Sequence, residues 1–286
     1  MRLAPFAPAG TAPRADGPSS DPPDGAEGAG GDRADVALLL HGFGADRLSW
    51  LANAPALANA ADVLAPDLPG HGASAAIDPD GFDGTLGAVR AAVDAWLETR
   101  RDSGRPVRLH LVGHSLGGAL AIALAADPAL PVASLVAIAP AGLGAGIDVG
   151  WLRALVALRD EARALEHLRR LVADPRMISR QAAGALVAHL GRDGVRARLD
   201  TLARDLDGLE TRVGSAAREV ASRGVPRASV WGELDAVNPP DPARAAALGV
   251  ATVHVERAGH LPHVERAGRF NRLALELIGS AAPAAR

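Results

Sequence analysis

The chain has 286 residues, a formal net charge of −3 and a sequence pI near 6.3. It contains no cysteine, which excludes thiolate catalysis and a disulfide framework. All 30 basic residues are arginine and the charges nearly balance, so the composition gives no support to nucleic-acid binding. The sequence shows neither a signal-peptide-like start nor an apolar run near the ~20 residues of a membrane span. We therefore expect a cytoplasmic protein that binds neither nucleic acid nor membrane.

Residues 1–34 are rich in Ala, Pro, Gly and Asp, a composition typical of a disordered tail or linker. From residue 35 onward, short apolar runs alternate with helical patterns, which predicts a parallel sheet covered by helices on both faces. The strands are expected near 35–40, 61–66, 107–112, 132–138, 227–231 and 251–256. The helices are expected near 48–59, 84–101, 116–126, 241–248 and 262–278.

The alternation of strands and helices breaks between residues 138 and 226. Over 151–172, 179–190 and 195–221, Leu, Val and Ala recur at helical spacing with Arg, Asp and Glu between them. We interpret 142–224 as a helical cap inserted into a core formed by 35–141 and 225–280. Such a cap would cover a site at the strand ends and line its pocket.

The segment 113–117 reads Gly-His-Ser-Leu-Gly, directly after an expected strand and before an Ala- and Leu-rich helix. This is the pattern of a nucleophile elbow, in which the serine sits on a tight strand-to-helix turn with strained backbone angles. The flanking glycines leave room for the neighbouring strand and helix. The sequence therefore predicts Ser115 as an exposed nucleophile, with His114 beside it as a substrate contact.

A nucleophilic serine also needs backbone donors for an oxyanion, a general base, and an acid that orients the base. The expected strand at 35–40 ends in His41-Gly42-Phe43-Gly44, whose small residues would let a backbone N–H approach a substrate carbonyl. We assign the N–H groups of Phe43 and Leu116 as the oxyanion donors, and Gly42 as a further substrate contact.

The candidate acid and base follow the last two expected strands, Asp235 after 227–231 and His260 after 251–256. Loops at the carboxyl ends of parallel strands are where sheets of this kind place their active sites. We expect His260 to be the base, since Gly259 permits the close turn that points the ring at the serine. His263 is the alternative base, and Asp148 the alternative acid.

Other polar residues near these motifs fit structural roles. His41 and His71 lie in loops whose backbone they would shape, Asp67 would stabilise its own loop, and Glu233 is expected to be a solvated charge. A Gly-rich phosphate loop with lysine is impossible in this composition. We therefore expect neither a metal nor an organic cofactor.

These motifs, in this order, resemble the α/β-hydrolase family over roughly residues 35–278. The segments that carry the resemblance are 41–44, 67–74 (Asp-Leu-Pro-Gly-His-Gly-Ala-Ser), 113–117, 231–235 and 259–260. The resemblance implies an α/β-hydrolase fold, with a mostly parallel sheet wrapped by helices and an inserted helical cap.

Two further segments, 134–144 and 171–175, resemble the hydrolase-like domain in the acetyltransferase component of acetoin dehydrogenase complexes. That resemblance implies association with a dehydrogenase complex, and a homo-oligomer is the other partnership that we consider. Acyl-carrying components of such complexes bear a lipoyl group on lysine. Because this sequence has no lysine, it cannot be the lipoylated chain.

The function expected from these residues is hydrolysis of a small carboxylic ester or thioester through an acyl-enzyme. Acyl transfer to an alcohol or thiol uses the same intermediate, and carbon–carbon bond hydrolysis occurs on the same scaffold, so both stay open. A serine at the elbow, where an aspartate would stand, argues against the dehalogenase and epoxide-hydrolase branches. A noncatalytic partner-binding role is the remaining class.

Overall fold

The computed structural model describes residues 1, 3, 5–6, 34–101 and 106–281. In this part of the chain, six parallel strands form one sheet in the order β2-β1-β3-β4-β5-β6. The strands are β1 (Asp35–Leu40), β2 (Asp62–Leu64), β3 (Arg108–His114), β4 (Val132–Ile138), β5 (Arg227–Gly232) and β6 (Thr252–Val255). All six lie where the sequence predicts strands, and the parallel sheet confirms the predicted fold class.

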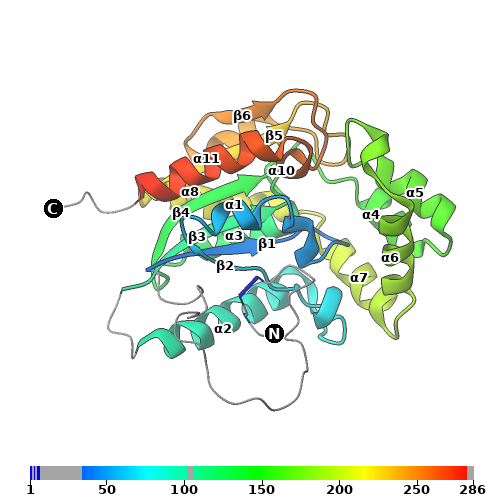
Figure 1. Ribbon diagram of the computed structural model, residues 1–286, viewed down its shortest axis with the longest axis horizontal. Helices are drawn as coiled ribbons and strands as arrows, with labels where there is room; N and C mark the ends of the chain where they lie inside the picture. Colours follow the sequence, from blue (N-terminus) through cyan, green and yellow to red (C-terminus); the bar gives the residue numbers. More distant parts are fainter. Residues whose placement is uncertain (2, 4, 7–33, 102–105, 282–286) are drawn as a thin grey trace, which may run out of the picture.

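Alternate residues of each central strand enter two separate apolar layers, because successive strand side chains point to opposite faces. Leu38, Leu40 and Leu111 pack in one layer, and Leu39 and Val112 in the other. The first layer is covered by α2 (Gly81–Arg101), α3 (Leu116–Ala126) and α8 (Leu209–Ser222). The second is covered by α1 (Ala54–Leu57) and α11 (Ala267–Ser280), which lie on the opposite side of the sheet in Figure 1.

The strand order reverses between β1 and β3. From β1 the chain runs outward to β2, then returns to β3 on the other side of β1, and from there proceeds to β6. A crevice forms outside the carboxyl ends of parallel strands at such a reversal. Leu40 pairs with Gly113 across these strands, so the loops that follow β1 and β3 must lie side by side.

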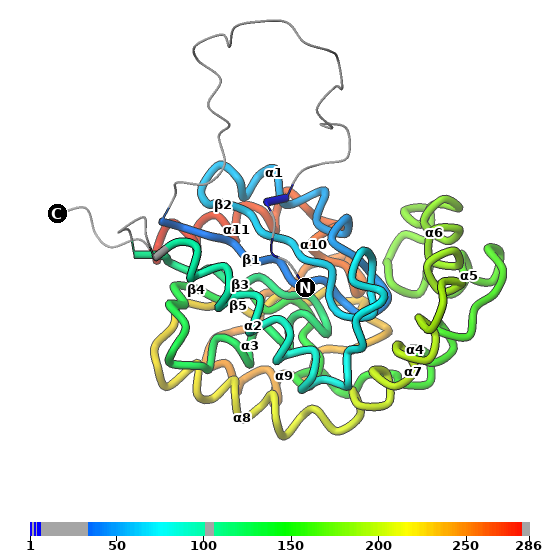
Figure 2. Tube along the Cα trace, turned by 90° about the horizontal axis from the view of Figure 1, so that it is seen from below, coloured from blue at the N-terminus to red at the C-terminus, as the bar shows by residue number. Residues whose placement is uncertain are grey.

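The helices of 149–205 stand together beyond the carboxyl ends of the strands, as Figures 1 and 2 show. We call them the outer helices: α4 (Val149–Ala157), α5 (Glu161–Arg169), α6 (Arg180–Leu190) and α7 (Val195–Asp205). They pair among themselves, α4 with α7 and α5 with α6. In contrast, α8 packs on α3 and on the 3-10 turn η4 (Ala246–Leu248). The segment 142–224 thus contains four outer helices and one helix of the sheet's own covering layer.

Shorter elements complete the chain. The short α-helices are α9 (Pro242–Ala245) and α10 (Pro262–Glu265), and the other 3-10 turns are η1 (Arg47–Trp50), η2 (Gly72–Ser74) and η3 (Pro175–Met177). None of the helices in the described ranges combines the length and apolar character that crossing a bilayer requires.

The first residues of the chain touch the edge strand β2. Pro5 forms an isolated antiparallel bridge with Leu64, and the N–H of Phe6 donates to the carbonyl of Val63 at 2.9 Å. The segment 1–34 that the sequence predicts as a disordered tail therefore includes two residues that lie against the sheet. Residues 7–33, most of that predicted tail, lie outside the described residues.

Candidate active site

Ser115 sits at the turn between β3 and α3 with a positive φ of 52° and a ψ of −114°. A non-glycine residue with positive φ is strained, and such strain persists where the surroundings hold it. The N–H of Ser115 donates to the carbonyl of Ile138 at 2.9 Å, and its own carbonyl accepts from Ala119 and Ala141. These backbone bonds hold the turn on both sides, and none of them uses the serine hydroxyl.

The two glycines that flank the turn allow the helix to approach the sheet. A Cβ on Gly113 would lie 2.1 Å from the carbonyl oxygen of Gly117, and a Cβ on Gly117 would lie 2.0 Å from that of Leu40. No side chain fits at either position without moving backbone. The Gly-x-Ser-x-Gly pattern is therefore a packing requirement of this elbow.

His260 and Asp235 form a hydrogen-bonded pair, with 2.7 Å between His260 Nδ1 and Asp235 Oδ2. The two residues are 3% and 5% exposed. The other carboxylate oxygen accepts from the N–H groups of Val237 and Asn238, each at 2.9 Å. A carboxylate fixed in this way accepts the Nδ1 proton and leaves Nε2 as the basic nitrogen of the ring.

The two alternatives from the sequence lie elsewhere. His263 is fully buried between Trp50 and His114, and its ring nitrogens have no hydrogen-bond partner among the described residues. Burial lowers the pKa of His263 to about 3. Asp148 caps α4 by accepting from the N–H of Trp151 at 2.8 Å and pairs with Arg170. Neither residue lines the cavity that Ser115 and His260 share.

The loop after β1 lies directly over the elbow. A Cβ on Gly42 would lie 2.7 Å from His114 Nδ1 and 3.3 Å from the Cβ of Ser115. Leu116, fully buried, begins α3 at the first helical position, where a backbone N–H has no partner within the helix. The expected donors on Phe43 and Leu116 thus belong to two segments that flank the serine.

Two buried histidines hold that loop from behind. His41 donates from Nδ1 to the carbonyl of Gly42 at 2.8 Å and accepts at Nε2 from the N–H of Leu68. His71 accepts from the N–H of Gly44 at 3.1 Å. Burial lowers the pKa of both rings, that of His71 to about 3, so both stay neutral and keep an acceptor nitrogen. They shape the loop as expected.

His114 braces the loop between β6 and α10 that carries His260 (residues 256–261), which we call the histidine loop. Its Nε2 donates to the carbonyl of His260 at 2.8 Å, and the two ring centroids are 4.7 Å apart. Burial, first of all, and the neighbouring His263 and His260 hold the pKa of His114 well below its usual range. His114 also lines the cavity over the serine, and its role as a substrate contact stays a prediction.

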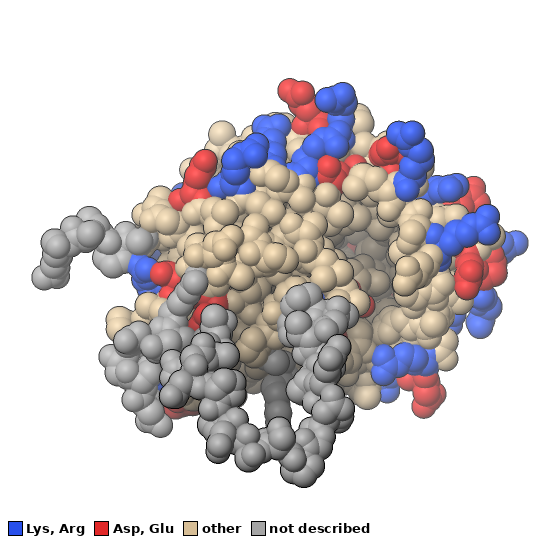
Figure 3. All heavy atoms as spheres, in the orientation of Figure 1, with Lys and Arg blue, Asp and Glu red and all other residues tan. Residues whose placement is uncertain are grey.

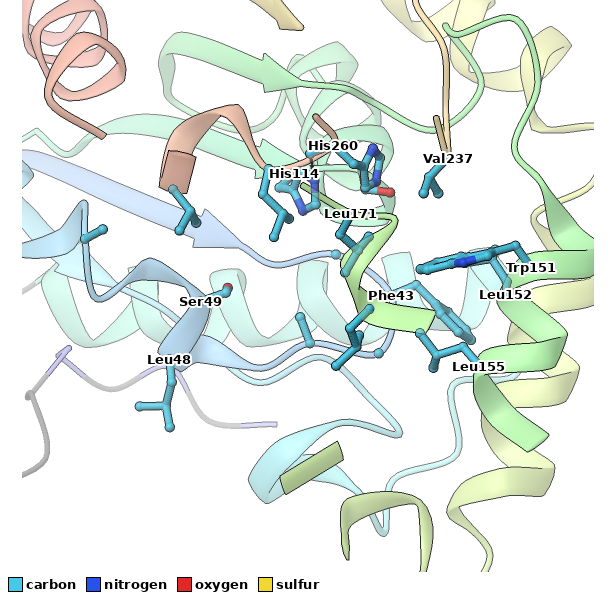
Figure 4. Close-up of a pocket in the computed structure, with 18 of the residues that line it drawn as sticks. Phe43, Leu48, Ser49, His114, Trp151, Leu152, Leu155, Leu171, Val237 and His260 are labelled. Carbon is cyan, nitrogen blue, oxygen red and sulfur yellow. Dashed lines mark hydrogen bonds between the residues drawn. The ribbon is translucent and has the colours of Figure 1, made fainter. Parts of the chain in front are cut away.

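The cavity over Ser115 has a volume of about 340 Å³. It opens as a hollow beside the outer helices in Figure 3, where most of the surrounding atoms are uncharged. In Figure 4, Phe43, Trp151 and Leu155 face one another at one end, and His114 and His260 lie at the other. None of the lining residues is charged: Gly42, Phe43, Gly44, Ala45, Leu48, Ser49, Leu51, Ala52, His114, Ser115, Trp151, Leu152, Leu155, Leu168, Leu171, Val237, His260, Leu261 and Val264.

No cluster of three or more metal-ligating side chains occurs in the described part of the chain. His110 and His114 are four positions apart, a spacing that brings two rings together on a helix. On strand β3 the same spacing separates them by about 13 Å. His110 instead contacts Ser134 at 2.7 Å and Asp35 at 2.9 Å.

The sequence analysis missed Glu265, the last residue of α10. Its carboxylate accepts from the N–H groups of Gly259 and Ala173, each at 2.7 Å. The only local signal is a glutamate five residues after His260 in a short apolar segment. Nothing in the sequence links it to residue 173.

The architecture is that of a hydrolase: the elbow serine and the buried histidine–carboxylate pair lie at the strand ends of a parallel sheet, beside an apolar cavity. The chain belongs to the alpha/beta hydrolase family, whose sequence model matches residues 37–273. Two curated relatives are the dihydrolipoyllysine-residue acetyltransferase components of the acetoin cleaving system from Cupriavidus necator and Pseudomonas putida. They are 31% identical over 249 residues and 35% identical over 251 residues, respectively. Each alignment covers 87% of this chain but only 65% of the relative.

Solved structures share the fold. A meta-cleavage product hydrolase from Pseudomonas fluorescens IP01 superposes with a TM-score of 0.72 at 22% identity, covering 88% of this chain and 93% of that one. The 2-hydroxy-6-oxo-6-phenylhexa-2,4-dienoate hydrolase from Rhodococcus sp. strain RHA1 also gives 0.72, at 20% identity, covering 87% and 92%. These similarities confirm the architecture that the motif order predicts.

Proposed function

We propose that the protein is a serine hydrolase that cleaves small, uncharged carboxylic esters through an acyl-enzyme. The observation that carries this proposal is the shared cavity of Ser115 and His260, with His260 paired to the buried Asp235 at 2.7 Å. Nucleophile, base and orienting acid are the three parts that acyl transfer to a serine needs.

In the proposed mechanism, His260 Nε2 removes the hydroxyl proton as Ser115 Oγ attacks the ester carbonyl. The N–H groups of Phe43 and Leu116 stabilise the oxyanion, and His260 then returns the proton to the leaving alcohol. A water molecule, activated by His260, cleaves the acyl-enzyme. Asp235 holds the neutral ring in the tautomer that has a basic Nε2 and stabilises the imidazolium that forms when Nε2 takes the proton.

The cavity supports an uncharged substrate of modest size. Leaving an ion in an apolar site without a partner costs several kcal/mol, and no lining residue carries a formal charge. The lowered pKa of His114 keeps that ring neutral as well. The volume of about 340 Å³ is near the lower end of the range of roughly 300–1,000 Å³ for small-ligand pockets. We propose that the outer helices act as the cap that closes this cavity.

Acyl transfer is the second candidate, because the curated relatives are named as acetyltransferase components. A thiol or alcohol would then replace water in the second step, and association with a dehydrogenase complex would be expected.

Carbon–carbon bond hydrolysis ranks third. The Rhodococcus neighbour is named for a dienoate, an anion, and the cavity here has no cationic side chain for it. The cytoplasmic location stays a prediction.

Two matched substrate comparisons test these candidates. We expect p-nitrophenyl butyrate to be cleaved with a kcat/KM at least about 100-fold above that of the p-nitrophenyl half-ester of succinate, since an unpaired carboxylate costs several kcal/mol. Equal rates would contradict the uncharged-substrate assignment. Adding dihydrolipoamide, a neutral thiol, should leave the acid as the product; formation of the S-acyl thiol in its place would favour the transferase.

A further inference from the structure

Glu265 ties two segments together that are far apart in the sequence. It lies at the end of α10 and is 7% exposed. One carboxylate oxygen accepts from the N–H of Gly259, the residue before His260, and the other from the N–H of Ala173, which follows α5. Both distances are 2.7 Å, the length of charge-assisted hydrogen bonds.

The same two segments are in direct backbone contact. The N–H of His260 donates to the carbonyl of Leu171 at 2.8 Å. A Cβ on Gly259 would lie 2.8 Å from that carbonyl oxygen and 3.0 Å from the backbone nitrogen of Ala173. Since the side chain of Leu171 lines the cavity, the wall of the pocket and the histidine loop form one hydrogen-bonded unit.

No cationic side chain among the described residues forms a salt bridge with Glu265. Arg266 is adjacent, but its guanidinium donates to the backbone carbonyls of Glu265 and Arg257. A buried carboxylate without a counter-ion is costly to desolvate. The N–H groups of Gly259 and Ala173 are therefore the contacts that hold the carboxylate in place. In return, the carboxylate fixes the positions of these two backbone groups relative to each other.

We propose that Glu265 is a positioning residue. By accepting hydrogen bonds from Gly259 and Ala173 it clamps residues 259–260 to residues 171–173, and so fixes the position of the His260 ring relative to Ser115. The proposal rests on the proposed function, because it assigns the clamp to the serine–histidine step. His260 Nε2 must serve both the serine hydroxyl and the leaving group, and a misplacement of about 1 Å can cost about 100-fold in rate.

Glu265→Gln tests the clamp at nearly constant volume. A glutamine has one acceptor oxygen and one NH₂ donor, so one of the two backbone N–H groups would face another donor. Glu233→Gln is the matched control, because Glu233 is exposed in the loop beside Asp235. The measurements are kcat per fluorophosphonate-titrated site, KM, and hydrogen exchange of peptides that contain 171–173 and 259–260.

We expect Glu265→Gln to lower kcat per titrated site about 10- to 100-fold, with KM within about threefold of the wild type. Both peptides should exchange faster, and Glu233→Gln should change none of these values. An unchanged kcat per titrated site, with only a lower melting temperature, would overturn the positioning role. So would unchanged exchange at either segment.

If Glu265→Gln does not fold, Glu265→Asp decides by the same measurements. It keeps the charge but is one methylene shorter and cannot reach both donors, so we expect a smaller loss of kcat with faster exchange at one segment. A Glu265→Asp variant with wild-type kcat per titrated site and wild-type hydrogen exchange would overturn the proposal. Absence of Ser115-dependent turnover in the wild type would instead refute the proposed function, and with it any catalytic role of the clamp.

Discussion

The loops at the strand ends and the outer helices contribute to the same cavity by different kinds of contact. Around Ser115, His260 and Asp235, placement depends on directional backbone hydrogen bonds and on glycines where a Cβ would meet backbone or the His114 ring. The outer helices contribute apolar side chains such as Trp151 and Leu155. Apolar contacts are non-directional and tolerate substitution when volume is kept.

This difference separates two kinds of effect. Changes in the strand-end loops should move groups that act in the transition state, and therefore lower kcat. Changes in the outer helices should alter the space for the substrate, and therefore alter selectivity. The comparison fails if substitutions in the outer helices lower kcat as much as substitutions in the loops do. It also fails if displacing the loops leaves kcat unchanged.

The largest effect should come from the base. We expect His260→Ala to lower kcat roughly 10⁴- to 10⁶-fold, as for removal of a general base from a serine triad. His263→Leu should stay within about tenfold of the wild type, since the ring nitrogens of His263 have no hydrogen-bond partner among the described residues and His263 does not line the cavity. Steady-state kinetics on p-nitrophenyl butyrate measures both. The reverse order would move the base to residue 263.

The next effect concerns the loop over the serine. Gly42→Ala places a methyl group 2.7 Å from His114 Nδ1 and 3.3 Å from the Cβ of Ser115, so either the loop with the Phe43 N–H or the His114 ring beside the serine must shift. We expect kcat to fall about 10²- to 10³-fold, the usual cost of one lost oxyanion donor. Gly87→Ala on α2 is the control, because a Cβ there meets nothing within 4 Å. A Gly42→Ala enzyme with wild-type kcat would remove Phe43 from the oxyanion site.

A smaller, selective effect should come from the outer helices. Leu155→Ala enlarges the cavity beside Phe43, so p-nitrophenyl hexanoate should gain about tenfold over the butyrate in relative kcat/KM. Two extra buried methylenes, at about 0.8 kcal/mol each, account for such a gain. Met177→Ala is the control within the same region, since Met177 is 44% exposed and does not line the cavity. An unchanged chain-length profile would contradict the cap's role in selectivity.

The smallest effect is on stability and its pH dependence. Burial lowers the pKa of His263 from about 6.5 in the unfolded chain to about 3 in the folded state, so the unfolded state binds more protons between these values. The free energy of unfolding therefore falls as pH drops from 6.5 towards 3, by up to about 1.4 kcal/mol per pH unit from this group. Urea unfolding at pH 7 and pH 5 should show a shallower fall in His263→Leu. An unchanged slope would contradict the neutral buried state of His263.

Local patterns were enough to predict the sheet and the elbow. Each strand is a short apolar run with its own turn signals. Gly113 is required by contacts within one strand–turn–helix unit, whereas the close contact at Gly117 is with the backbone of Leu40 on β1. Which helices of 142–224 belong to the outer group could not be predicted from the sequence. Helical spacing shows that 209–222 has an apolar face, but it does not show that this face covers α3.

The site divides in the same way. The motif order favoured Asp235 and His260, and the structure pairs them; Asp148 and His263 could be set aside only once their neighbours were known. Glu265 could not be predicted, because its second partner is 92 positions away in the sequence. Its partners are backbone N–H groups, which nearly every residue has, so no pattern of residue types in the sequence indicates which segments it joins.

The most direct test of the central claim is covalent labelling. Wild type and Ser115→Ala are treated with a fluorophosphonate, and intact mass and peptide mapping are measured beside p-nitrophenyl butyrate turnover. We predict one adduct per wild-type chain, on the peptide that contains Ser115, and loss of both adduct and turnover in the variant. An adduct on another residue, or turnover that survives in Ser115→Ala, would contradict the account.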